Sequence, residues 1–213
     1  MLTASARARA RAPERVTSRP ALSAFGAFAL YLIASIAIWG RDVVAHLGSR
    51  YVAIGHVGDP DYFRWALAWT PWALTHGRSP LTSDLVFAPQ GIDLRWSAIV
   101  PGPAIVAWPV TKLFGTLVSY NVWMLLGPAL AGWGAFLVCR RVTHATWPSI
   151  AGGAVFGFSA SMAAQMQSHL NLVLIFPVPL AVYLVIRRVE GSIGRVAFLI
   201  WARKFPICIP SRL

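Results

Sequence analysis

The chain has 213 residues, of which 57% are hydrophobic and 12% are charged, and its net charge is +12. Together with a mean hydropathy of +0.60, this composition excludes a soluble globular domain and predicts an all-α integral membrane protein. A charge of this size in a soluble protein would favour a nucleic-acid ligand. Here the basic residues flank apolar runs, as they do in membrane proteins, so we expect no nucleic-acid partner.

The first expected elements are a basic tail, residues 1–20, and an apolar helix, residues 21–39. The tail carries five arginines against Glu14 alone: Arg7, Arg9, Arg11, Arg15 and Arg19. Residues 21–39 contain no charged side chain, and at about 1.5 Å per residue such a run just spans the hydrocarbon core. The positive-inside rule then places the N-terminus in the cytoplasm. We expect the protein to lie in the plasma or inner membrane. An organellar transit peptide has a similar composition, but the span that follows is too long for a signal-peptide core.

Three further apolar runs are expected to span the bilayer: residues 118–139, 147–164 and 170–186. Arginine pairs follow the first and last of them, Arg140-Arg141 and Arg187-Arg188, and both pairs fit the cytoplasmic side. Residues 98–114 are also apolar, but a fifth crossing there would move both pairs outside, and its three prolines interrupt a helix. We therefore predict a polytopic bundle of four spans, with helices 2–4 within residues 118–188 and residues 98–114 at the interface or re-entrant.

The external segment, residues 40–117, holds five of the seven acidic residues: Asp42, Asp59, Asp61, Asp84 and Asp93. Within it, Asp59 followed by Pro60 predicts a helix start, with Asp59 as the N-cap. Four aromatic residues then recur at helical spacing: Tyr62, Trp65, Trp69 and Trp72. Such an aromatic stripe, with Arg64 on another face, favours a helix lying in the headgroup layer.

Several motifs in this order resemble the C-type (GT-C) membrane glycosyltransferases, and in particular a hypothetical bacterial branch of that superfamily. The motifs are Gly58-Asp59-Pro60 with Trp65 and Trp69, His76-Gly77-Arg78-Ser79-Pro80, residues 88–94, Leu113-Phe114-Gly115, and Ser168-His169-Leu170-Asn171. The resemblance covers roughly residues 21–188. It implies transfer of a sugar from a polyprenyl-phosphate donor to a glycan, lipid or protein acceptor, on the external face and with inversion at the anomeric carbon.

The resemblance also implies site residues. Asp59 fits the general base, with Asp61, Asp84, Asp93 and His169 as secondary candidates. A cation must meet the leaving phosphate, and Arg64, Arg78 and Arg95 are the candidates. No cofactor is expected, while a divalent metal stays an open alternative.

Simpler interpretations stand beside these. Asp59 can cap its helix without any catalytic role. Asp59-Pro60-Asp61 also spells the D-x-D of nucleotide-sugar transferases, but no Gly-rich strand-turn-helix unit accompanies it. The tryptophans fit membrane anchors better than sugar platforms. Gly153 and Gly157 fit a helix-packing face, and Cys139 and Cys208 have no metal or disulfide spacing.

Two other functions remain in view. A non-catalytic membrane assembly subunit accounts for the same features, whereas a transporter would normally carry charges at mid-membrane. Residues 189–213 lose apolar continuity after Trp201. We expect this tail to reflect a truncation or frameshift, in which case the polypeptide is an N-terminal fragment of an enzyme and can be inactive by itself.

Overall fold

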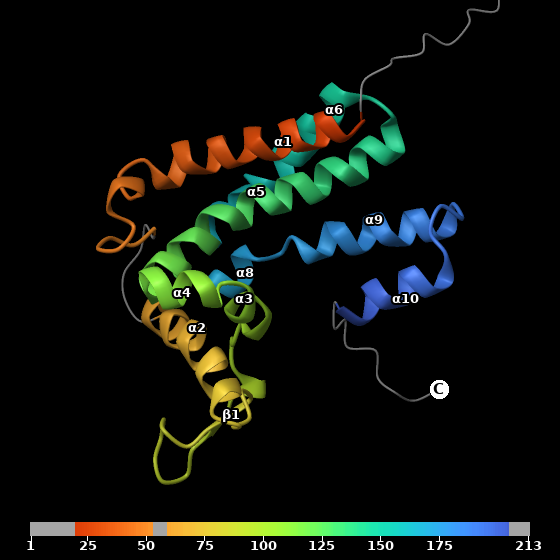
Figure 1. The fold of residues 1–213 in the computed structure, drawn as a ribbon. Helices are drawn as coiled ribbons and strands as arrows, with labels where there is room; N and C mark the ends of the chain where they lie inside the picture. Colours follow the sequence, from red (N-terminus) through yellow and green to blue (C-terminus); the bar gives the residue numbers. More distant parts are fainter. Residues whose placement is uncertain (1–19, 53–58, 205–213) are drawn as a thin grey trace, which may run out of the picture.

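The computed structural model describes residues 20–52 and 59–204, with side chains from 24 to 200 within those ranges. The described chain is mostly helical (Figure 1). This confirms the all-α prediction. The basic tail with its arginines, Gly58 and the last nine residues with Cys208 lie outside the described residues.

The upper layer in Figure 1 is built around one long helix, α5 (Thr116–Thr143). Three helices pack on it: α1 (Pro20–Ser35), α6 (Thr146–Gly157) and α9 (Pro177–Val189). The helix α1 continues as a π-helical turn, η1 (Ile36–Gly40), and Ser35 Oγ donates to Leu125 O of α5 over 2.7 Å. The packing buries Tyr31 and Phe136 almost completely.

The contact between α5 and α6 depends on small residues. Gly153 and Gly157 of α6 are buried against Gly132 of α5, and a Cβ at Gly157 would lie 2.6 Å from Pro128 O. The Tyr31 hydroxyl crosses the same junction and donates to Ile150 O over 2.8 Å. The expected packing role of Gly153 and Gly157 is therefore confirmed, because the two backbones approach more closely than any side chain permits.

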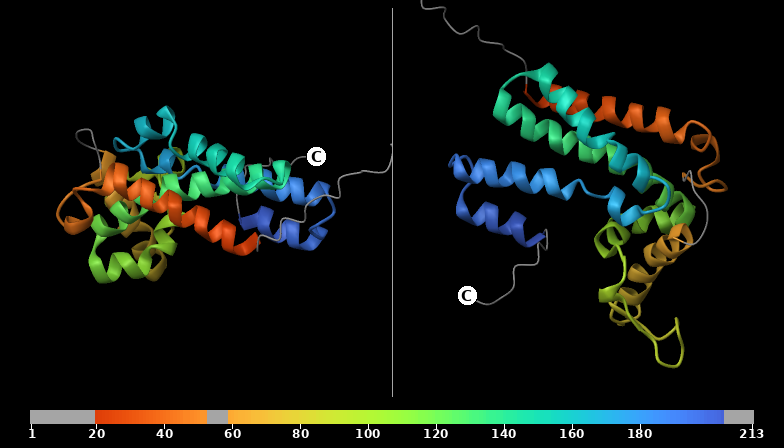
Figure 2. Two further views of the ribbon diagram at one scale, coloured as in Figure 1. Left: turned by 90° about the horizontal axis from the view of Figure 1, so that it is seen from above. Right: turned by 180° about the vertical axis from the view of Figure 1, so that it is seen from behind.

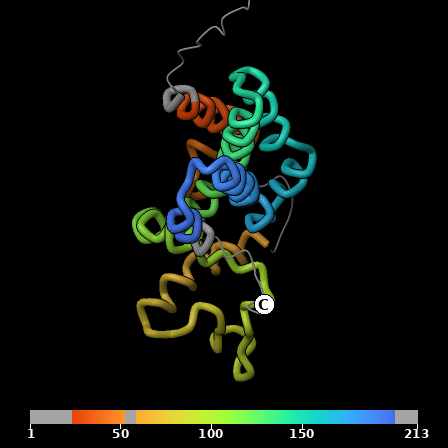
Figure 3. Tube along the Cα trace, turned by 90° about the vertical axis from the view of Figure 1, so that its right-hand side faces the viewer, coloured from red at the N-terminus to blue at the C-terminus, as the bar shows by residue number. Residues whose placement is uncertain are grey.

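The lower layer holds the long segment between α1 and α5. Its elements are η2 (Val44–His46), α2 (Asp59–Thr75), β1 (Thr82–Ser83), β2 (Ile92–Asp93), η3 (Leu94–Trp96), α3 (Pro101–Val106) and α4 (Trp108–Phe114). The strands β1 and β2 form a short antiparallel ladder, with Thr82 opposite Asp93. Figure 3 shows this hairpin projecting away from the bundle, while α2, α3 and α4 pack beside the start of α5.

The predicted aromatic stripe is present on α2. Trp65 stacks on Trp69, Trp69 on Trp72, and Trp72 on His76, with ring centroids 5.5, 5.3 and 4.4 Å apart. Trp69 is only 4% exposed, because it packs on Leu94 and donates from Nε1 to Pro80 O over 3.1 Å. The middle of the stripe therefore anchors the hairpin to α2 and does not face outward. This differs from the predicted stripe, which was expected to lie wholly in the headgroup layer.

Two stretches in the described residues are long and apolar enough to cross a membrane. They are α5 and the stretch Leu170–Val189, which α8 (Leu170–Val173) and α9 form together. The stretch Ala24–Gly40 is apolar but shorter. Two helices of this kind are consistent with membrane association, and the four-span topology stays a prediction.

The expected span at residues 147–164 is not one helix. The helix α6 ends at Gly157, and α7 (Ala160–Gln165) begins afresh, because Ser159 Oγ caps it by accepting from Met162 N over 3.2 Å. The run 170–186 is also interrupted, between α8 and α9, where Pro177 supplies the first residue of α9. The final helix, α10 (Arg195–Lys204), has 10 residues.

Candidate functional site

The structure places Asp59 beside His169. Asp59 begins α2, His169 immediately precedes α8, and Asp59 Oδ2 lies 3.3 Å from His169 Nε2. The two residues are 110 positions apart in the chain, and both side chains remain about half exposed. In the described part of the chain, His169 is the residue that contacts the Asp59 carboxylate.

The pair is held by the hydrophobic core beneath it. Phe63 and Leu67, one and two turns into α2, are buried in the same cluster as Met166 and Leu170, which flank His169. Both helix ends therefore rest on one packed surface, and each contributes one polar residue at its edge. Because buried side chains fix the backbone, the Asp59–His169 contact is positioned by packing and not only by its own attraction.

The other ring nitrogen of His169 is also notable. Nδ1 is buried and has no hydrogen-bond partner among the described residues. A buried ring nitrogen without a protein partner is a place for a hydroxyl group or a water molecule.

A second unpartnered polar atom lies in the same region. Tyr120, in the first turns of α5, is completely buried, and its hydroxyl has no hydrogen-bond partner. Its ring meets that of Tyr51 edge-on at 5.8 Å, and Tyr120 lies within electrostatic range of Asp59. Two of the three unpartnered buried side-chain atoms found among the described residues thus lie in the region of Asp59, the third being Thr70 Oγ1.

Asp61 belongs to a separate cluster on another face of α2. Tyr51 donates from its hydroxyl to Asp61 Oδ1 over 2.5 Å, and Arg64 Nη1 lies 3.0 Å from the same oxygen and 2.6 Å from the Tyr51 hydroxyl. The bond from Tyr51, together with the Arg64 contact, lowers the pKa of Asp61, while burial and the bond to Asp61 raise the pKa of Tyr51. Arg64 Nε also reaches Thr116 Oγ1 over 3.4 Å.

This geometry bears on the alternative that Asp59 and Asp61 form the D-x-D motif of nucleotide-sugar transferases. Residues two apart on a helix point in directions about 200° apart. Asp59 meets His169 and Asp61 meets Tyr51 and Arg64, so the two carboxylates do not converge. The described residues contain no group of three or more His, Cys, Asp or Glu side chains placed to share a metal ion.

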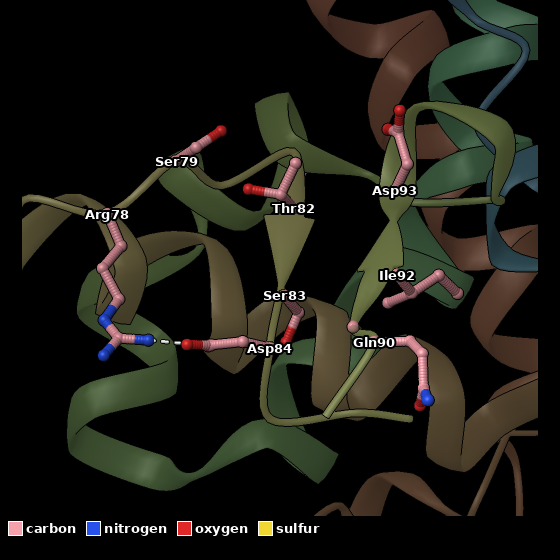
Figure 4. A pocket seen from close by; sticks show the side chains of 9 residues that line it. Arg78, Ser79, Thr82, Ser83, Asp84, Gln90, Ile92 and Asp93 are labelled. Atoms are coloured by element: carbon pink, nitrogen blue, oxygen red, sulfur yellow. Dashed lines mark hydrogen bonds and ion pairs between the residues drawn. The ribbon is translucent and has the colours of Figure 1, made fainter. Parts of the chain in front are cut away.

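The remaining sequence candidates lie at the other end of α2. A polar cleft of about 490 Å³ is formed there by the hairpin (Figure 4). Arg78 Nη1 pairs with Asp84 Oδ1 at 2.7 Å on its wall, while Asp93 is bonded by Arg95, which lowers the pKa of the Asp93 carboxyl. Since α2 has 17 residues, its two ends are about 24 Å apart. Asp59 is therefore brought together with His169, and near Asp61 and Arg64, but not with the hairpin candidates.

Asp42 is a residue that sequence reasoning did not single out. It follows the end of η1 and lines a cleft of about 300 Å³ together with Trp39, Tyr51 and Met166. The cleft adjoins the candidate site, because Tyr51 contacts Asp61 and Met166 lies three residues before His169 in the connecting turn. The sequence feature that could have identified Asp42 is its position shortly after the first apolar helix.

No curated protein and no solved structure matches the chain significantly. A family model described as a domain of unknown function, DUF6311, matches residues 27–204, which include the second half of α1, the candidate site and the later helices. The chain belongs to the DUF6311 family.

Proposed function

We propose that the protein is, or is the N-terminal part of, a GT-C-type membrane glycosyltransferase that uses Asp59 as a general base. Its donor is a sugar linked to polyprenyl phosphate, and its acceptor carries a hydroxyl group on the external face of the membrane. The observation that carries the proposal is the Asp59–His169 contact, with two unpartnered buried polar atoms in the same region. A carboxylate that only capped its helix would not require a histidine from 110 residues away.

The chemistry assigns each residue a step. Asp59 accepts the proton of the acceptor hydroxyl as that oxygen attacks the anomeric carbon. The bond from the anomeric carbon to the phosphate oxygen breaks, and polyprenyl phosphate leaves with the electron pair, so the configuration inverts. His169 orients the carboxylate through Nε2, and Arg64 is the nearest of the candidate cations for the leaving phosphate, with a side chain 35% exposed.

The arrangement of helix ends supports the proposed four crossings. The end of α5 and the end of α9 lie together, joined by an ion pair of Arg141 with Glu190 at 2.5 Å. The start of α1 lies at this same end in both views of Figure 2, and α2 and α8, which begin at the Asp59–His169 contact, lie at the opposite end. The helices α3 and α4 are only 6 and 7 residues long, too short to cross a bilayer. This arrangement of the helices is consistent with arginines on the cytoplasmic side of the membrane and a candidate site on the external side.

The topology is testable by cysteine labelling, in a background where Cys139 and Cys208 are replaced by alanine. Single cysteines at Gln90 and Gln167, both exposed, should react in intact cells with a membrane-impermeant maleimide. A cysteine at Ser192, beside the cytoplasmic arginines, should react only after the membrane is permeabilised. Labelling of Ser192 before permeabilisation, or protection of Gln167 throughout, would contradict the four-span arrangement.

The site itself is tested by a double-mutant cycle. Sugar transfer from a polyprenyl-phosphate-linked donor is measured in membranes that contain the wild-type protein, Asp59→Asn, His169→Gln or both changes. If His169 acts through Asp59, the loss caused by His169→Gln should largely disappear in the Asp59→Asn background. Additive losses would mean that His169 does not act through Asp59. Transfer that is absent from wild-type membranes, with the protein present and folded, would favour either an N-terminal part that is inactive by itself or a non-catalytic membrane assembly subunit.

A further inference from the structure

Asn121, in the second turn of α5, is a completely buried polar residue that the proposed reaction does not use. A buried amide side chain is costly unless its oxygen and both N–H groups find partners. Asn121 Oδ1 accepts a hydrogen bond from Val52 N over 2.9 Å. Its Nδ2 donates to Leu47 O over 2.8 Å and to Arg50 O over 2.7 Å. All three bonds therefore go to the backbone of one short segment.

That segment, residues 47–52, takes part of its shape from Asn121. It forms turns and lies in no helix or strand, so its carbonyl and amide groups need other partners. Arg50 O and Val52 N are the carbonyl and the amide on either side of Tyr51. The bonds from Asn121 therefore fix the backbone on both sides of Tyr51, and Val52, 2% exposed, packs in the hydrophobic core. The direction of the Tyr51 side chain follows from that backbone.

Tyr51 in turn contacts Arg64 of α2. Its hydroxyl donates to Asp61 Oδ1 and accepts from Arg64 Nη1 over 2.6 Å, and the guanidinium carbon lies 5.6 Å from the centroid of the Tyr51 ring. Arg64 Nε reaches Thr116 Oγ1 over 3.4 Å. Among the described residues, Arg64 Nη2 makes no hydrogen bond, so its two N–H groups can bind a phosphate oxygen. Tyr51 thus contributes to the orientation in which Arg64 presents Nη2.

We propose that Asn121 is a positioning residue for the phosphate of the polyprenyl-phosphate donor, and that it acts through Tyr51 on Arg64. The inference rests on the proposed function, in which Arg64 meets the leaving phosphate. An arginine side chain loses rotamer freedom when it binds, and a partner that orients it beforehand reduces that loss. A purely structural role of Asn121 would affect every ligand equally, whereas a positioning role affects only ligands that carry the phosphate.

The test is binding of polyprenyl phosphate, and of polyprenol of the same length, to the purified full chain in detergent, measured by native mass spectrometry. The two ligands differ only in the phosphate. Arg64→Gln should weaken binding of the phosphate ester by about tenfold, as loss of a hydrogen bond to a charged group does. Asn121→Leu removes all three backbone bonds and should weaken it by about threefold, because one side chain is no longer oriented in advance. Neither change should alter the binding of polyprenol.

Tyr51→Phe tests the same series of contacts without disturbing the buried amide. It removes only the hydroxyl that bonds Arg64, and it should also weaken polyprenyl phosphate binding by about threefold. In the Arg64→Gln background, Asn121→Leu and Tyr51→Phe should each have little further effect. The matched control is Tyr31→Phe, which removes a hydroxyl bonded to Ile150 O over 2.8 Å at the junction of α1 and α6. It should lower the thermal unfolding midpoint and leave the binding of both ligands unchanged.

Equal weakening of both ligands by Asn121→Leu would make Asn121 a structural residue only and would overturn the inference. So would full-strength binding of polyprenyl phosphate by Tyr51→Phe, or losses that add to that of Arg64→Gln. The proposed function would survive these results, because binding would still depend on Arg64. Wild-type protein that binds polyprenol as tightly as polyprenyl phosphate, or an unaltered Arg64→Gln variant, would instead contradict the proposed function and this inference with it. Circular dichroism identifies any variant that has unfolded, and if Asn121→Leu does so, Tyr51→Phe decides.

Discussion

Asp59→Asn is expected to reduce sugar transfer by a factor of about 10² to 10⁴, the range that general-base catalysis typically contributes. Asparagine keeps the size of the side chain, caps a helix about as well as aspartate, and keeps one oxygen that can accept a hydrogen bond. It removes only the basicity of the carboxylate. Expression level and the thermal unfolding midpoint should therefore stay close to those of the wild-type protein, while initial rates with a polyprenyl-phosphate-linked donor fall.

The matched control is Asp61→Asn, because Asp61 lies two residues away on the same helix but contacts Tyr51 and Arg64. Its effect on transfer should be much smaller. A comparable loss at both positions would instead favour a role shared by the two carboxylates, such as metal binding. Full activity of the Asp59 variant together with a severe loss for Asp42→Asn would transfer the role of base to the neighbouring cleft.

Gly157→Ala is expected to destabilise the bundle by about 1–3 kcal/mol, as overpacking of a close contact does. A Cβ at this position would lie 2.6 Å from Pro128 O and 2.8 Å from the Cα and N of Gly132. All three atoms belong to the α5 backbone, so no side chain can rotate away and the helices themselves must separate. The measurement is the thermal unfolding midpoint in detergent, followed by circular dichroism or by retention of the monodisperse form.

Gly26→Ala is the control for that change. Gly26 lies on α1 with no atom within 4 Å of its added Cβ, so alanine meets only open space there. Since alanine favours a helix by up to about 1 kcal/mol over glycine in water, the control should be neutral or slightly stabilising. Equal destabilisation by both changes would indicate that α5 and α6 do not pack as closely as the structure has them.

The sequence by itself determined the features that arise within one segment. Apolar runs predicted the helical class, Asp59 and Pro60 predicted the start of α2, and the spacing of Trp65, Trp69 and Trp72 predicted its aromatic stripe. Local patterns are sufficient for these because a helix is stabilised by its own repeating hydrogen bonds and by a face of regular spacing. The small-residue face of α6 was also readable, since Gly153 and Gly157 are one turn apart.

Only the tertiary structure decided which polar residues meet. Asp59 and His169 were separate candidates until the burial of Phe63, Leu67, Met166 and Leu170 in one hydrophobic cluster placed the starts of α2 and α8 together. The length of α2 separated the hairpin candidates from them, and the burial of Trp69 turned an expected membrane-facing stripe into an anchor for the hairpin. Contacts between distant segments follow from how whole surfaces pack, and no local spacing records them.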